Sequence, residues 1–209
     1  MNLVFDFGAV LFSWQPQDLL RRYFPQQAAS TERAVALARD FFHHPDWLAF
    51  DRGALSMAAV ISRTSARLAL PAPAVQALVA NIGALLTPLP DTVALLQRLR
   101  TRRDRHGDVR LYYLSNMPAP YARTLEQRHD FLQCFDGGVF SGDVQLIKPE
   151  PAIYELLERR YGLDPTRTVF IDDLPGNVVA AQARGWHGIH FESAQQVQTQ
   201  LAPWLVSTV

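Results

Sequence analysis

The sequence has almost no cysteine and no excess of charge of either sign. Cys134 is the one cysteine among 209 residues, so an intramolecular disulfide and a cysteine-rich metal site are both excluded. Lysine and arginine together number 20, as do aspartate and glutamate, which gives a net charge of zero. Without a net positive charge there is no global field to attract nucleic acid or anionic lipid, so we expect a small diffusing ligand.

Long apolar segments are also missing. No run approaches the roughly 20 apolar residues needed to span a bilayer, so we expect no membrane partner. The N-terminus leads directly into residues 2–6, with no basic leader and no apolar run long enough for export. These features predict a cytoplasmic protein.

Short apolar runs alternate with helical patterns over the second half of the sequence. Four runs have the pattern of buried parallel strands, at residues 3–5, 111–114, 168–171 and 187–191. Helical patterns occupy residues 91–103, 120–128, 149–161 and 175–184. Pro149 and Pro175 fit the first turn of a helix, and Gly162 and Gly185 fit the position just past a helix end. The alternation predicts an α/β fold with an open parallel sheet.

Residues 14–87 break this rhythm. They have apolar residues at helical spacing and no convincing strand, and the segment Thr87-Pro88-Leu89-Pro90 has the composition of a linker. We therefore predict a helical domain at 14–87, inserted after the first strand into a core made of residues 1–13 and 88–209.

Polar side chains follow three of the four predicted strands. Asp6, Ser115, Asp172 and Asp173 come at strand ends, and Lys148 precedes a predicted helix. Ligands of open α/β sheets bind outside the carboxyl ends of the strands, so we expect these residues to meet at one edge. Three carboxylates beside one lysine would repel a phosphate dianion unless a divalent cation were also bound.

These segments, taken in order, resemble the four motifs of the haloacid dehalogenase superfamily. The segments are the apolar strand that ends in Asp6, Leu114-Ser115-Asn116, Lys148-Pro149-Glu150-Pro151, and Phe170-Ile171-Asp172-Asp173 with Asn177. Residues 5–11 look especially like the branch of sugar-1-phosphate phosphatases. The resemblance implies a Rossmann-like core with a helical cap, and magnesium-dependent hydrolysis of a phosphorylated small metabolite, with a sugar phosphate favoured.

The resemblance also implies a role for each matching residue. Asp6 would be the nucleophile that forms an aspartyl-phosphate. Mg²⁺ would be bound by the carboxylates of Asp6 and Asp172 and by the backbone carbonyl of Gly8. Ser115, Lys148 and the backbone amides of Phe7, Gly8 and Asn116 would bind the phosphoryl oxygens. Asp173 and Asn177 would orient the metal shell and the ammonium of Lys148.

One position departs from the pattern of the family's phosphatases. They usually carry a second aspartate two residues after the nucleophile as general acid and base, and this chain has Gly8 there. Either the leaving group departs with little protonation, or Asp51, His43 or His44 takes over the proton transfer, or the chemistry is not phosphoryl transfer. The last case leads to two alternatives, a 2-haloacid dehalogenase with Asp6 as nucleophile or a non-catalytic binding protein. The Asp172-Asp173 pair suits a metal site better than a metal-free pocket.

The insert contains the candidates for substrate specificity. His43, His44, Trp47 and Arg52 would line the substrate pocket if the insert is a cap over the strand ends. For aromatic residues such as Trp47 a packing role is favoured over substrate contact, because a small helical bundle needs core residues. Arg52 sits in a turn-like segment with Gly53, and its guanidinium could reach a substrate.

Overall fold

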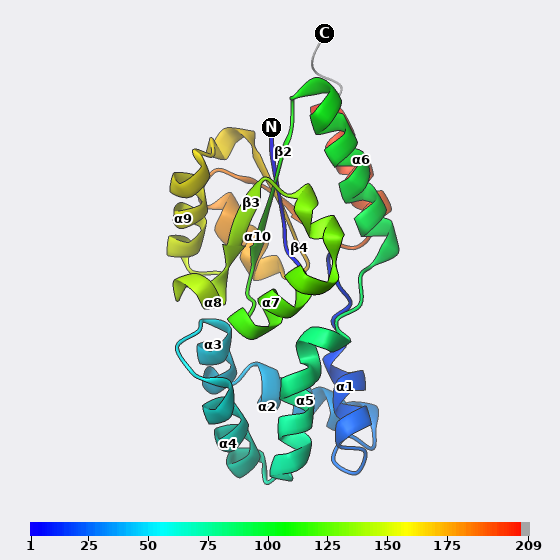
Figure 1. The fold of residues 1–209 in the computed structure, drawn as a ribbon, viewed down its shortest axis with the longest axis vertical. Coiled ribbons are helices and arrows are strands. Elements are labelled where there is room, and N and C mark those ends of the chain that lie inside the picture. Colours follow the sequence, from blue (N-terminus) through cyan, green and yellow to red (C-terminus); the bar gives the residue numbers. More distant parts are fainter. Residues whose placement is uncertain (206–209) are drawn as a thin grey trace.

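Five parallel strands form one sheet in the order β3-β2-β1-β4-β5, so the first strand of the chain lies at its centre (Figure 1). The computed structural model describes residues 1–205. The strands are β1 Asn2–Phe5, β2 Arg110–Ser115, β3 Gly137–Phe140, β4 Thr168–Asp172 and β5 His187–His190. The predicted α/β fold with a parallel sheet is therefore confirmed.

The side chains of β1 alternate between two apolar layers, one on each face of the sheet. Leu3 and Phe5 pack in the layer that includes residues of α6 and α11, whereas Val4 packs with residues of α9 and α10. Both faces are covered, as expected for a parallel sheet with apolar strands. The helices of this core are α6 Pro90–His106, α7 Ala119–Arg128, α8 Ser141–Val144, α9 Pro151–Tyr161, α10 Pro175–Gln182 and α11 Ala194–Leu205, with short 3-10 helices η1 Asp130–Cys134 and η2 Pro165–Arg167.

The remaining helices form a separate group, which we call the cap. They are α1 Pro16–Tyr23, α2 Thr31–Phe42, α3 Pro45–Asp51, α4 Met57–Leu68 and α5 Ala72–Leu85. Residues 14–87, all of which the structure describes, contain no strand. Figure 1 shows the cap beyond one end of the sheet, on the side away from the N-terminus. The helical insert is thus confirmed, while the domain boundaries at 14 and 87 stay a prediction.

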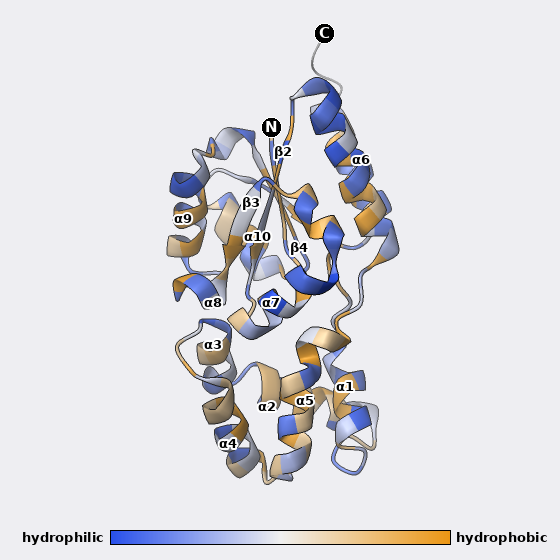
Figure 2. Cartoon of the chain, viewed as in Figure 1, coloured by the Kyte–Doolittle hydropathy of each residue, from blue (hydrophilic) through white to orange (hydrophobic). Residues whose placement is uncertain are grey.

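The surface of α6 carries the most basic stretch of the chain. Residues 98–105 lie in its C-terminal half, which Figure 2 shows as mainly hydrophilic. Gly107 ends this helix in the left-handed region.

Among residues 1–205, no helix has the length and apolar character required to cross a membrane.

The sequence pattern does not predict β3. Two of its residues, Gly137 and Gly138, are glycines, which weaken a strand and are rare in strand interiors. Hydrogen bonding to β2 places Gly138 opposite Tyr113, whose ring occupies the space where a residue-138 side chain would be. A Cβ on Gly138 would lie 2.3 Å from Cγ of Tyr113. The strand therefore depends on a contact between residues distant in the sequence.

The start of α9 corrects a second prediction. Pro151, and not Pro149, lies in the first turn of this helix. Glu150 precedes a proline and is extended, with φ of −62° and ψ of 131°, because a following proline disfavours the helical conformation. Lys148 and Pro149, which are joined by a cis peptide bond, are left in the loop before the helix. Gly162 ends α9 as predicted.

The cap contacts the core through a turn at residues 51–53. Oγ of Ser141 donates a hydrogen bond to the backbone oxygen of Asp51 at 2.5 Å. The guanidinium of Arg52 pairs with the carboxylate of Glu150 and also donates to the backbone oxygen of Gln145. This turn therefore fixes the end of α3 against the loop that carries Lys148.

Gly53 allows this close approach, and its replacement should destabilise the protein. Its φ is +79°, and a Cβ at this position would lie 2.5 Å from the backbone oxygen of Gly142. Gly107 provides a matched control, because its φ is +66° but a Cβ there would meet no atom within 4 Å. We expect Gly107→Ala to lower the free energy of unfolding by about 1 kcal/mol through backbone strain alone.

Gly53→Ala should lower the free energy of unfolding by about 1–3 kcal/mol more than the control, because it adds a steric clash. Urea unfolding followed by circular dichroism measures both variants. Equal losses for the two variants would show that the cap does not press on the core at Gly53.

Candidate active site

The strand register places two aspartates side by side. Phe5 at the end of β1 pairs with Ile171 in β4, so Asp6 follows next to Asp172. The backbone amide of Asp6 donates to the oxygen of Ile171 at 2.9 Å. The chain builds β2 and β3 on one side of β1 and then β4 and β5 on the other. Asp6 and Asp172 thus lie at the point where the strand order reverses, the usual ligand position in such sheets.

Lys148 joins these two aspartates. Its Nζ lies 2.9 Å from Oδ1 of Asp6 and 2.7 Å from Oδ2 of Asp172. The side chain of Lys148 is 1% exposed and that of Asp172 is fully buried. Charges buried this deeply are tolerated only when they are paired and hydrogen-bonded.

Asp172 accepts further hydrogen bonds that fix its carboxylate. Nδ2 of Asn177 lies 3.0 Å from Oδ1 and 3.1 Å from Oδ2, and the backbone amide of Leu174 donates to Oδ1 at 2.8 Å. The sequence predicts that Asn177 orients the metal shell and Lys148. In the structure Asn177 contacts Asp172 directly and reaches Lys148 only through that carboxylate.

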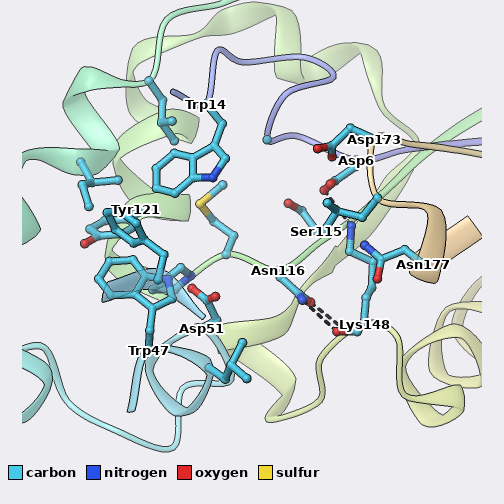
Figure 3. Close-up of a pocket in the computed structure, with 18 of the residues that line it drawn as sticks. Asp6, Trp14, Trp47, Asp51, Ser115, Asn116, Tyr121, Lys148, Asp173 and Asn177 are labelled. Carbon is cyan, nitrogen blue, oxygen red and sulfur yellow. Dashed lines mark hydrogen bonds and ion pairs between the residues drawn. The ribbon is translucent and has the colours of Figure 1, made fainter. Parts of the chain in front are cut away.

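Asn116 holds the backbone of Lys148 in place. Its Oδ1 accepts from the amide of Lys148 at 2.8 Å, and its Nδ2 donates to the oxygen of Lys148 at 3.0 Å (Figure 3). Ser115, the last residue of β2, precedes Asn116 and is 1% exposed. Figure 3 shows Ser115 between Asn116 and Asp6. The end of β2 therefore positions both Ser115 and the lysine loop.

Asp6, Asp172 and Asp173 offer the ligands of a divalent cation. One carboxylate oxygen of each lies within 4.8 Å of the others. Oxygens on opposite sides of one Mg²⁺ are about 4.2 Å apart, so small shifts would bring all three into contact with a single ion. When all three are ionised, the ammonium of Lys148 leaves two negative charges uncompensated. The donor set therefore fits a hard divalent cation such as Mg²⁺.

The pKa values reflect this crowding. Burial raises the pKa of Asp6 to about 6, against the opposing effect of Lys148. Burial and the nearby charges of Asp6 and Asp172 raise the pKa of Asp173 to about 7. For Lys148, burial lowers the pKa, but Asp172 and Asp6 together outweigh it and the net shift is upward. The lysine therefore stays charged, while the raised pKa values of Asp6 and Asp173 disfavour their ionisation.

A cavity of about 240 Å³ separates the strand ends from the cap. Its core side includes most of the predicted catalytic and binding residues, and Figure 3 shows their side chains facing the cavity. The lining residues of the core are Asp6, Gly8, Ser115, Asn116, Met117, Pro118, Tyr121, Lys148, Asp173, Leu174 and Asn177; those of the cap and its linkers are Trp14, Phe42, His43, Trp47, Leu48, Asp51, Ile82 and Leu86.

Two of the four predicted specificity residues line this cavity and two lie elsewhere. His43 and Trp47 are in its wall. Nδ1 of His44 accepts from the backbone amide of Asp46 at 3.1 Å and so caps the start of α3, away from the cavity. Arg52 is not in the wall, and its guanidinium pairs with Glu150. His44 thus serves the start of α3 and Arg52 the contact between cap and core, roles that the sequence pattern could not distinguish from substrate contact.

The backbone amide of Phe7, a predicted phosphate contact, is hydrogen-bonded to the neighbouring residue. Its backbone amide donates to Oδ1 of Asp6 at 2.7 Å, and its ring is buried against Tyr113 and Phe140. This amide thus orients the carboxylate of Asp6. Gly8, by contrast, lines the cavity.

Several lining residues are absent from the sequence prediction. Met117 and Leu174 directly follow Asn116 and Asp173, so their place after a strand-end motif could have indicated them. Tyr121 and Ile82 on helices, and Leu86 just past the end of α5, carry no comparable signal, because helix packing brings them to the wall.

Comparison with known proteins agrees with the geometry. A family model for haloacid dehalogenase-like hydrolases matches residues 4–185. A sesquiterpene phosphatase from Aspergillus oryzae is 27% identical over 187 residues, which span 90% of this chain and 87% of that protein.

Solved structures share the fold at lower identity. A HAD family enzyme from Bacteroides thetaiotaomicron in complex with magnesium and inorganic phosphate has a TM-score of 0.70 at 20% identity, covering 91% of this chain and 93% of that one. L-2-haloacid dehalogenase from Xanthobacter autotrophicus, with chloropropionic acid covalently bound, has a TM-score of 0.66 at 18% identity, covering 99% and 84%.

Removing the buried ammonium of Lys148 should destabilise the protein far more than removing an exposed positively charged side chain. Lys148→Met leaves two buried carboxylates without their partner, and we expect the free energy of unfolding to fall by about 3–5 kcal/mol. Arg21→Met breaks an exposed pair with Asp18 and should cost less than about 1 kcal/mol. Urea unfolding at neutral pH without metal compares them. Similar losses for both would contradict the buried geometry of Lys148.

Stability should fall as the pH rises through the range in which the site ionises. Asp6 and Asp173 have reference pKa values of 3.8, raised in the fold to about 6 and about 7. Between these values the folded protein binds more protons than the unfolded chain, so unfolding becomes easier from about pH 4 to about pH 7. Asp173→Asn should flatten this dependence.

Magnesium should reverse this loss, because it binds the deprotonated carboxylates. We expect the rise in Tm on adding Mg²⁺ to be larger at about pH 8 than at about pH 5. Thermal unfolding with Mg²⁺ and with EDTA measures it. A rise that does not change with pH would argue against metal binding at these carboxylates.

Proposed function

Because the chain belongs to the haloacid dehalogenase-like hydrolases, we propose that it is a Mg²⁺-dependent phosphatase that hydrolyses phosphomonoesters of a small metabolite. The observation that carries the proposal is the group of three carboxylates, Asp6, Asp172 and Asp173, beside the buried ammonium of Lys148. The sesquiterpene phosphatase relative supports phosphate ester chemistry, and the solved neighbour with magnesium and phosphate supports the choice of cation.

Asp6 is the proposed nucleophile. Its Oδ1 accepts from the backbone amide of Phe7 and pairs with Lys148. Oδ2 would form a bond to phosphorus as the ester P–O bond breaks, which releases an alcohol once its oxygen gains a proton. Water would then cleave the aspartyl-phosphate, releasing inorganic phosphate and restoring Asp6.

The other residues hold the phosphoryl group and the cation. Lys148 and Ser115 face the cavity next to Asp6 and would bind the phosphoryl oxygens as negative charge develops on them. The carboxylates of Asp6 and Asp172 and the carbonyl of Gly8 would bind Mg²⁺, with Asp173 completing its surroundings. The bound cation would withdraw charge from the phosphoryl oxygens.

Proton transfer to the leaving group is the role that lacks a residue at its usual place. Asp51 and His43 line the same cavity as Asp6, whereas His44 does not. Burial raises the pKa of Asp51 well above 3.8, so it holds a proton at a higher pH than an exposed aspartate. Of the three residues that the sequence suggests for this proton, Asp51 and His43 are therefore the candidates that line the cavity.

Two indications of the substrate's organic group point to different classes of compound. The resemblance of residues 5–11 to sugar-1-phosphate phosphatases favours a sugar phosphate. The sesquiterpene phosphatase relative points to an apolar ester. Both classes share the phosphoryl chemistry proposed for Asp6.

Dehalogenation of a 2-haloacid is the second candidate, and one observation favours it. Gly8 stands where the family's phosphatases usually carry a proton-donating aspartate, and a departing halide would need no proton. Asp173 argues against it, because its carboxyl lines the cavity and would repel the carboxylate of a haloacid.

Substitution of the nucleophile tests the proposal. With Mg²⁺, the protein should release phosphate from p-nitrophenyl phosphate, and Asp6→Asn should lower kcat by about 10³-fold or more. Asp18→Asn, which removes an exposed carboxylate on α1, should behave like the unchanged protein. EDTA should abolish the activity. Full activity in Asp6→Asn or in EDTA would overturn the mechanism, and chloride release from 2-chloropropionate would favour the second candidate.

A further inference from the structure

The cavity has a polar end and an apolar end. The polar end is formed by Asp6, Ser115, Lys148 and Asp173, where the phosphoryl group of the proposed function would bind. The organic group of the ester must then occupy the end formed by the cap and by the residues that follow Asn116. The nature of that second wall determines which esters fit.

Hydrocarbon surface dominates the second wall. It includes three aromatic rings of the cap side, those of Trp14, Phe42 and Trp47. Phe42 packs edge-on against both tryptophans, with ring centroids 5.1 Å from Trp14 and 4.8 Å from Trp47. The other apolar members are Leu48, Ile82, Leu86, Met117, Pro118 and Leu174.

The hydroxyl of Tyr121 adds little polarity to this wall. It donates to the backbone oxygen of Val79 at 2.6 Å, so the residue contributes mainly its ring to the lining. Figure 3 shows this hydroxyl pointing away from Asp6 and Ser115. One potential partner for a substrate hydroxyl is thus already engaged.

Few polar groups of the cap remain for a substrate. They are the imidazole of His43, the carboxyl of Asp51 and the indole N–H of Trp14. Hydrogen bonding from Trp47 partly offsets the effect of burial on the pKa of Asp51, which still rises, so this carboxyl is less charged than an exposed aspartate. Several sugar hydroxyls buried here would lack partners, and each unpaired polar group is costly.

We propose that the organic group of the substrate is a hydrocarbon chain or ring system, as in an alkyl or terpenoid phosphate, bound between the aromatic wall of the cap and Met117 and Tyr121. This proposal rests on the phosphatase function proposed for Asp6. A hydrocarbon gains affinity from such a wall in proportion to the area that leaves water. The phosphoryl group supplies the polar contacts at the other end.

A series of primary alkyl phosphates tests the proposal on the whole protein with Mg²⁺. Butyl, hexyl and octyl phosphate have the same leaving-group chemistry and differ only in apolar length. Glucose 6-phosphate is also a primary alkyl ester, but its organic group is polar. We expect kcat/KM to rise about fourfold per methylene until the cavity is filled, and to be lowest for glucose 6-phosphate. Each ester is kept below its micelle-forming concentration.

Two cap variants separate wall contacts from general effects. Leu48 lines the cavity and is 40% exposed, so Leu48→Asn should fold and should lower the ratio of kcat/KM between octyl and butyl phosphate by about fivefold. Val35 on α2 is 50% exposed and is not in the lining. Val35→Asn should leave that ratio unchanged. Equal effects of both variants would overturn the assignment of the wall.

The reference ester p-nitrophenyl phosphate distinguishes failure of the substrate assignment from failure of the proposed phosphatase function. If it is hydrolysed and glucose 6-phosphate is the best alkyl ester, or chain length has no effect, the apolar assignment is wrong while the phosphatase function stands. If neither p-nitrophenyl phosphate nor any other ester is hydrolysed, the proposed function fails and the substrate assignment fails with it.

Discussion

The buried ammonium of Lys148 between Asp6 and Asp172 is the contact on which the site depends. Three carboxylates at one sheet edge repel one another, and burial raises the pKa of Asp6 and Asp173. Lys148 compensates one charge and, with Asn177 and the Leu174 amide, fixes the direction of Asp172. The remaining negative charge makes the same edge suitable for a divalent cation, and with that cation for a phosphoryl group.

Core and cap contribute differently to the proposed reaction. The core places its polar groups by strand register, so their positions follow from the hydrogen bonds of the sheet. The cap contributes a wall that depends on helix packing, and its turn at residues 51–53 brings that wall against the core. Chemistry and specificity therefore have separate structural origins, which is why the phosphoryl end and the apolar end of the cavity can be tested separately.

The sequence predicted the parts of the molecule that follow from local pattern. Asp6, Ser115 and Asp172 end apolar strands, and parallel strands bring such ends to one edge. Lys148 was indicated by its motif, because a lysine before a proline-rich loop has no strand to place it. Local pattern does not predict β3, which forms by pairing with β2. It also does not separate His43 and Trp47, which line the cavity, from His44 and Arg52, which contact Asp46 and Glu150. The pairing of β3 with β2 and the ion pair of Arg52 join segments that are distant in the sequence, so the pattern of neither segment reveals them.

The central claim is that the carboxylates of Asp6 and Asp172 bind one divalent cation, with Asp173 and Lys148 beside it. Anomalous X-ray scattering from crystals soaked in Mn²⁺, a substitute for Mg²⁺ with a strong signal, measures this most directly. We expect one peak at about 2.0–2.3 Å from carboxylate oxygens of Asp6 and Asp172. A peak elsewhere, or none while Nζ of Lys148 still bridges the two aspartates, would contradict the account.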